Sequence, residues 1–140
     1  SVSLMKDGNA EFFTLGTSSK NPLDVSAQIY HSKVMHEIID IALSDENIDG
    51  LLMDLPSWYF SMDYHLTNDP TFEPNMIDAL SLGHSQDKPL IPIIQRVNCP
   101  NDRERVVHEL AERRVPVFGD PLDFIPLLPK ISSLARKMAR

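Results

Sequence analysis

Five histidines and one cysteine carry most of the chemical potential of this sequence, and their spacing decides what they could do. The histidines are His31, His36, His65, His84 and His108. No pair of them forms the His-Glu-x-x-His pattern of a zinc site, and none stands at ligand spacing from Cys99. Because a helix repeats every 3.6 residues, the spacing of His31 and His36 does not place them on one helical face. We therefore expect surface or half-buried histidines and no metal site.

His84 is the histidine whose neighbours suggest a reaction. It stands in Gly83-His84-Ser85, and a Gly-His pair can carry a phosphorylated histidine. The pair falls between a predicted helix and a predicted strand, and such connections lie opposite the ligand edge of a doubly wound sheet. We therefore expect no catalytic role for His84.

Phosphate-binding loops of the common kinds do not occur in the sequence. It contains 5 glycines, and none falls in a G-x-G-x-x-G or G-x-x-x-x-G-K pattern. We therefore expect no self-contained catalytic site and no cofactor bound by this chain alone.

Asp54 and Asp24 are better placed to meet a ligand. Asp54 falls near the carboxyl end of a predicted strand, where open α/β sheets bind ligands, although it could instead cap the loop at Pro56. Asp24 could cap the first helix or hold the turn at Pro22. Both the ligand-binding and the capping interpretations remain open from the sequence.

An aromatic cluster, Trp58-Tyr59-Phe60, follows the first predicted strand. Large aromatic side chains in a loop often anchor an interface with another domain. They can equally pack down on their own domain, so the sequence leaves both alternatives open.

Composition and charge exclude several classes of partner. The chain has 140 residues, enough for one domain with its own core, and a net charge of −7. An acidic domain has no electrostatic reason to bind nucleic acid or an anionic membrane. Arg136, Lys137 and Arg140 form a cationic cluster, but cations are expected in the last turn of a helix. A single cysteine and the lack of a long apolar run predict a cytoplasmic protein.

Hydrophobic periodicity predicts alternating helices and strands from residue 21 to 140, after a weakly patterned segment over residues 1–20. We expect helices over 27–44, 72–83, 101–114 and 129–138, and parallel neighbouring strands near 50–55, 90–95 and 115–118. The apolar strands are expected to be covered on both faces. Pro92 lacks an N–H, which places its strand near an edge or places the residue at the strand's start. Asn101 is the expected N-cap of the third helix.

The order of several short motifs resembles one family, the NDP-forming acyl-CoA synthetases of the succinyl-CoA synthetase type. The motifs are Asn21-Pro22-Leu23-Asp24-Val25, Ser44-Asp45, Ile48-Asp49-Gly50-Leu51-Leu52-Met53, Lys88-Pro89-Leu90-Ile91, Arg114-Val115-Pro116-Val117-Phe118 and Asp120-Pro121. They resemble the second half of the family's flavodoxin-like domain, and the match covers about residues 20–140.

This resemblance implies a three-layer flavodoxin-like α/β domain with helices on both faces of a parallel sheet. It implies ATP or GTP, Mg²⁺, CoA and an organic acid as the ligands of a larger assembly, with CoA-binding and ATP-grasp domains as partners. Asn21 and Asp24 would form a turn beside the phosphate site, with Asp54 at the ligand edge of the sheet.

The sequence also departs from the family. The family's phosphate loop would precede residue 1, its phosphohistidine has no match here, and Arg114 stands where the family has glycine. The chain is therefore expected to be a fragment, a split subunit or a degenerate copy, without catalytic residues and inactive alone. The alternative is a non-catalytic interaction module derived from the same domain.

Overall fold

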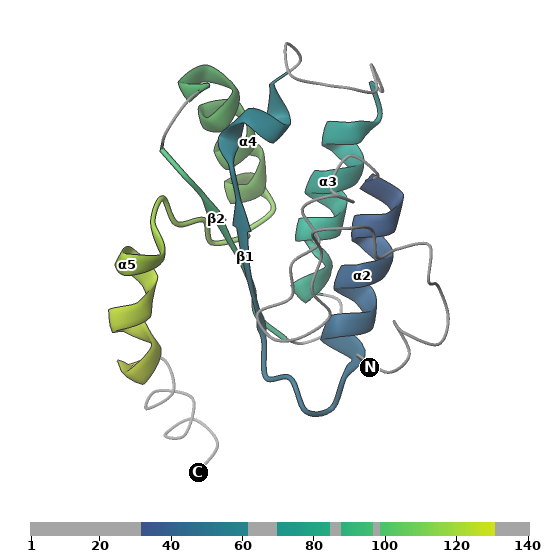
Figure 1. Ribbon diagram of the computed structural model, residues 1–140, viewed down its shortest axis with the longest axis vertical. Coiled ribbons are helices and arrows are strands. Elements are labelled where there is room, and N and C mark those ends of the chain that lie inside the picture. The colour runs from purple at the N-terminus through teal and green to yellow at the C-terminus, as the bar shows by residue number, and fades with distance from the viewer. Residues whose placement is uncertain (1–31, 62–69, 85–87, 97–98, 131–140) are drawn as a thin grey trace, which may run out of the picture.

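The computed structural model describes residues 32–61, 70–84, 88–96 and 99–130, which form a mixed α/β structure (Figure 1). Its elements are α2 (Ser32–Ser44), β1 (Leu51–Leu55), η3 (Ser57–Phe60), α3 (Phe72–Leu80), η5 (Leu82–His84), β2 (Leu90–Ile94), α4 (Pro100–Glu112), α5 (Pro121–Phe124) and η6 (Ile125–Leu127). The predicted alternation of helix and strand is confirmed for these residues. Among the described helices, none combines the length and the apolar character needed to cross a membrane.

The sheet is parallel, as the sequence predicts for its first two strands. β1 pairs with β2 in a register that runs from Leu51 opposite Leu90 to Leu55 opposite Ile94. A single parallel bridge joins Ile93 to Phe118 on the other side of β2. The segments therefore lie side by side in the same order as along the chain: β1, β2 and Phe118. Because connections between parallel strands are right-handed, the connecting helices α3 and α4 lie on the same face of the sheet.

The third predicted strand is reduced to that one bridge, and two prolines explain why. Phe118 N–H donates to Pro92 O over 3.1 Å, and Ile94 N–H donates to Phe118 O over 2.9 Å. The next two ladder bonds toward the amino end would need the N–H groups of residues 92 and 116. Both residues are prolines and have no such donor. Pro92 therefore ends the ladder on one side. Its strand β2 lies at an edge of the two-stranded sheet, as the sequence indicates, although Pro92 is not at the start of the strand.

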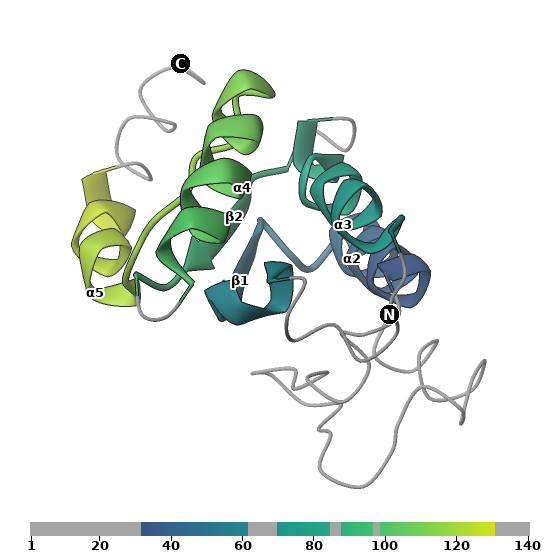
Figure 2. The ribbon, with the colours of Figure 1, turned by 90° about the horizontal axis from the view of Figure 1, so that it is seen from above.

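The core lies between the sheet and helices α2, α3 and α4, and Figure 2 shows α2 and α3 beside each other. Alternate strand residues Leu55, Leu90 and Ile94 enter this core, because side chains of a strand point to opposite faces in turn. Leu52 points the other way and is 44% exposed. The expected cover on both faces is therefore wrong for β1.

Helix α4 begins at Pro100, one residue before the expected range of 101–114. Its N-cap is Cys99, in the left-handed region at φ 41°, and no side chain caps the helix. Pro100 occupies the first helical position, where its missing N–H costs nothing. The expected cap, Asn101, lies inside the first turn, so that expectation is wrong.

The C-terminal helical segment starts at the Asp-Pro pair, as predicted. Asp120 caps α5 by accepting the Leu122 N–H on Oδ1 at 2.7 Å. Pro126 lies within η6, where the helical segment narrows to a 3-10 turn. Residues beyond 130 lie outside the described part of the chain, and so does most of the predicted helix over 129–138.

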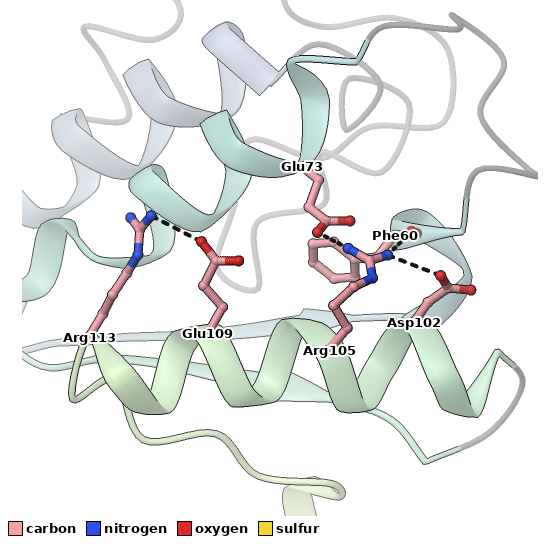
Figure 3. Close-up of polar contacts among 6 residues, drawn as sticks. All are labelled: Phe60, Glu73, Asp102, Arg105, Glu109 and Arg113. Atoms are coloured by element: carbon pink, nitrogen blue, oxygen red, sulfur yellow. Dashed lines mark hydrogen bonds and ion pairs between the residues drawn. The ribbon is translucent and has the colours of Figure 1, made fainter.

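Two arginines of α4 hold it against α3 and η3 (Figure 3). Arg105 pairs with Glu73 of α3 and with Asp102, and it donates to the carbonyl of Phe60 at 3.3 Å. Arg113 pairs with Asp78 of α3 and with Glu109. The hydrogen bond that Arg113 donates to Asp78 is the main cause that raises the pKa of Arg113, so this guanidinium stays cationic. Exposed pairs of this kind contribute about 0–1 kcal/mol each and mainly fix the orientation of the helix.

Helix α4 ends in a complete Schellman motif whose left-handed residue is Arg114, at φ 61°. Arg114 N–H donates to Ala111 O and Val115 N–H donates to Leu110 O, both at 2.9 Å.

We expect Arg114→Gly to raise the free energy of unfolding by about 1 kcal/mol, because glycine adopts this backbone without a steric penalty. Urea denaturation measures the change. Arg114→Ala keeps the strained backbone, so a gain as large as that of Arg114→Gly would show that the side chain, not the φ angle, is responsible.

Candidate functional site

The carboxyl edge of the sheet is where this fold brings polar residues from distant segments together. β1 ends at Leu55 and β2 at Ile94, and the bridging residue Phe118 leads directly into Gly119. Ligands of open α/β sheets bind at this edge because loops from several strands converge there. The residues that follow or end these segments are therefore the candidates for a site.

Asp54 occupies this edge, as the sequence predicts, and its partner is Gln95. The Gln95 side-chain amide donates to both carboxylate oxygens of Asp54, at 3.0 and 3.1 Å. Asp54 follows Met53 in β1 and points away from the helices, toward the face that carries Leu52. The pair is exposed, so it is open to a ligand at that face.

Arg96 lies against the backbone of Gly119. A Cβ placed on Gly119 would come within 2.9 Å of Arg96 Cγ and 3.1 Å of Cδ, so the absence of a side chain at 119 makes room for this arginine. The stem of Arg96 is thereby fixed beside the third segment of the sheet, while the residue as a whole stays exposed.

Arg103, one turn into α4, reaches the same point from the other side. Its Nε donates to the carbonyl oxygen of Ile94 at 2.9 Å. If the ladder between β2 and the third segment continued, that oxygen would instead accept the N–H of residue 120. Arg103 thus replaces a strand hydrogen bond where the chain leaves the sheet.

Arg96 and Arg103 differ from the two arginines that hold α4 in place. Arg105 and Arg113 each pair with two carboxylates. Within the described ranges, no carboxylate lies within ion-pair distance of Arg96 or Arg103. The carboxyl edge therefore presents two guanidinium groups without an anionic partner, in a protein whose net charge is −7.

The other residues singled out from the sequence lie elsewhere. Asn21 and Asp24, and the cationic residues 136, 137 and 140, fall outside the described residues. His84 ends η5, before β2 begins, and so lies toward the amino edge of the sheet. Asp54 is thus the one predicted ligand-edge residue that the structure describes.

The aromatic cluster is folded into the domain. Phe60 is fully buried and Tyr59 nearly so, and both belong to the core, while Trp58 is half-buried against it with its ring 4.1 Å from that of Tyr59. Of the two alternatives for this cluster, packing on the home domain describes Tyr59 and Phe60. A docking role would require these side chains to leave the core.

Among the residues that the structure describes, no group of three or more His, Cys, Asp or Glu side chains could hold a metal ion. Arg96 and Arg103 are functional candidates that only the structure reveals. A cation directly after a buried strand was the available signal for Arg96. Nothing in the pattern linked it to Arg103, because the hydrogen bond from Arg103 to Ile94 at the end of β2 is visible only in the fold.

Comparisons with known proteins add no relative to this description. No protein-family model matches the chain, and no significant match was found among curated proteins or solved structures.

Proposed function

We propose that this chain is a domain or subunit fragment of an NDP-forming acyl-CoA synthetase of the succinyl-CoA synthetase type. The observation that supports the proposal is where the family-like motifs fall in the fold. Ile48 to Met53 leads into β1, Lys88 to Ile91 leads into β2, and Val115 to Phe118 supplies the third parallel segment. A three-layer flavodoxin-like arrangement and a cytoplasmic location are part of the same proposal.

In such an assembly the chain would position ligands and would not perform the covalent steps. ATP or GTP, Mg²⁺ and CoA would be bound with CoA-binding and ATP-grasp partners. The edge residue Asp54, held by Gln95, would contact the bound ligand or the neighbouring domain. The chain alone is expected to show no acid-dependent and CoA-dependent ATP hydrolysis, because phosphoryl transfer needs a phosphate cradle and a bound metal.

Reconstitution tests this function. The chain is combined with the CoA-binding and ATP-grasp subunits encoded in the same genome, and thioester and ADP are measured with a panel of short organic acids. We expect activity only in the combined sample, and an approximately tenfold loss with Asp54→Asn, as for one charged hydrogen bond. Asp49→Asn is the matched control, because Asp49 is exposed at the opposite edge of β1. Turnover by the chain alone, or unchanged turnover without it, would refute the proposal.

The alternative function, a non-catalytic assembly module, is favoured by a different surface. Leu122, Ile125 and Leu128 recur at a spacing of three along α5 and the helical residues after it, and are 74%, 50% and 44% exposed. Large apolar side chains grouped on a surface often mark a contact with another protein. Light scattering of eluting complexes decides between the functions: a partner retained by the chain, yet inactive with it, favours the module.

A further inference from the structure

We propose that Arg96, Arg103 and the backbone at Gly119 form a binding site for a phosphate group at the carboxyl edge of the sheet. The proposal does not depend on the family resemblance, since it starts from the two guanidinium groups that have no carboxylate partner in the described residues. It also goes beyond the proposed function, which assigns Asp54 to this edge but no anion site.

Both arginines contact the carboxyl end of the paired segments. Ile94 N–H donates to Phe118 O at 2.9 Å, which fixes residue 118 beside the end of β2. Arg103 Nε donates to the carbonyl of that same Ile94, and Arg96 lies over Gly119, the residue after Phe118. Both side chains are therefore anchored within one residue of the same pairing.

Most hydrogen-bond donors of these arginines remain available. A guanidinium has several N–H donors, and of those on Arg103 only Nε has a protein acceptor in the described residues. Arg103 is half-buried, so leaving its remaining donors without an acceptor is more costly than it is on an exposed arginine. An anion that accepts hydrogen bonds from the N–H groups of both guanidiniums would satisfy these donors.

The nearby carboxylates do not neutralise the site. Asp54 is held by Gln95, and by strand alternation it points to the opposite face from the one that α4 covers. Asp120 accepts the Leu122 N–H at 2.7 Å as the cap of α5, and it forms no ion pair with Arg96 or Arg103. The positive charge of both guanidinium groups is therefore available to a ligand.

The number of charges selects phosphate over carboxylate. A phosphate monoester carries about −1.5 to −2 charges near neutral pH and has three acceptor oxygens, which match two guanidinium forks. A carboxylate carries one charge and is satisfied by one fork. The ligand is therefore a phosphate, either inorganic or the phosphate of a nucleotide.

Nuclear magnetic resonance of the full chain tests this site. Inorganic phosphate and adenosine 5′-monophosphate are titrated separately, with sodium chloride at matched ionic strength as the reference. We expect saturable shifts at the Gly119 amide and at the Nε–H groups of Arg96 and Arg103, and no such shifts with chloride. Tighter binding of the nucleotide would identify nucleotide phosphate as the source, and equal binding would identify the phosphate group alone.

Variants at the three residues of the site, with a control at Arg114, connect the signal to the residues. Arg96→Gln is expected to weaken binding about tenfold, the effect of losing one charge-assisted contact. Gly119→Ala keeps every charge but displaces the Arg96 stem, so it should also weaken binding. Arg103→Lys keeps the positive charge but lacks the planar guanidinium group. It therefore tests the role of that group even if Arg103→Gln fails to fold. Arg114→Gln is the matched control, because Arg114 lies at the far end of α4.

Three results would overturn the proposal. The first is a set of shifts that follows ionic strength without saturation. The second is equal weakening by Arg96→Gln and Arg114→Gln, which would indicate a general charge effect. The third is binding of acetate as tight as that of phosphate, which would remove the argument from two charges.

Discussion

Replacing Phe60 with alanine is expected to lower the free energy of unfolding by about 3–5 kcal/mol, the usual cost of emptying a fully buried aromatic position. Phe60 is 0% exposed and belongs to the core. Its carbonyl also accepts from Arg105, so a shift of η3 would disturb the contact with α4. Since small domains have a total stability of about 5–15 kcal/mol, the variant should lose a large share of its stability.

Trp58→Ala is the control for this result, because Trp58 is half-buried beside the same core. Its cost should be roughly half as large, in proportion to the apolar area that it removes from water. Urea denaturation followed by circular dichroism measures both variants. If Phe60→Ala left stability unchanged, the side chain would not be in the core and the interface alternative for this cluster would return.

Gly83→Ala is expected to lower the free energy of unfolding by about 1–3 kcal/mol, the range for forcing extra volume into a packed site. A Cβ at this position would lie 2.8 Å from both the backbone nitrogen of Leu90 and the carbonyl oxygen of Lys88. Backbone atoms at the start of β2 cannot move aside without disturbing the pairing of β2 with β1. Thermal denaturation of the variant measures the loss.

Gly119→Ala provides the contrast, because the atoms nearest to its new methyl group all belong to the side chain of Arg96. A flexible side chain can move aside, so the change in stability should stay within about 1 kcal/mol. If the two variants lost the same free energy of unfolding, the close approach of η5 to β2 would not be the reason for a glycine at position 83.

The order of elements was predictable because each element carries its own signal. Met35, Ile38 and Ile39 recur at helical spacing, and all three are buried in α2. The apolar run at Leu90 to Ile94 predicted a strand, and the parallel direction followed from the helices between strands. These inferences need only local periodicity and the handedness of crossovers.

The differences from the prediction arise where a distant segment decides the outcome. The third strand looked regular, but the register with Phe118 opposite Ile93 puts Pro92 and Pro116 at the two positions where the ladder needs an N–H donor, which no single segment reveals. The burial of Phe60 and Tyr59 depends on the core beneath η3. The contacts of Arg103 with Ile94 and of Arg96 with Gly119 depend on how distant segments pack, so the sequence could indicate the edge of the sheet but not these two residues.

The parallel pairing of all three segments is the claim on which the site depends, and scalar couplings across hydrogen bonds test it most directly. The account predicts couplings from the Ile94 amide to the Phe118 carbonyl, from the Phe118 amide to the Pro92 carbonyl, and from the Leu51 amide to the Pro89 carbonyl, at donor–acceptor distances of 2.9, 3.1 and 2.8 Å. Couplings of these amides to other carbonyls, or close Hα–Hα contacts of an antiparallel ladder between 51–55 and 90–94, would contradict it.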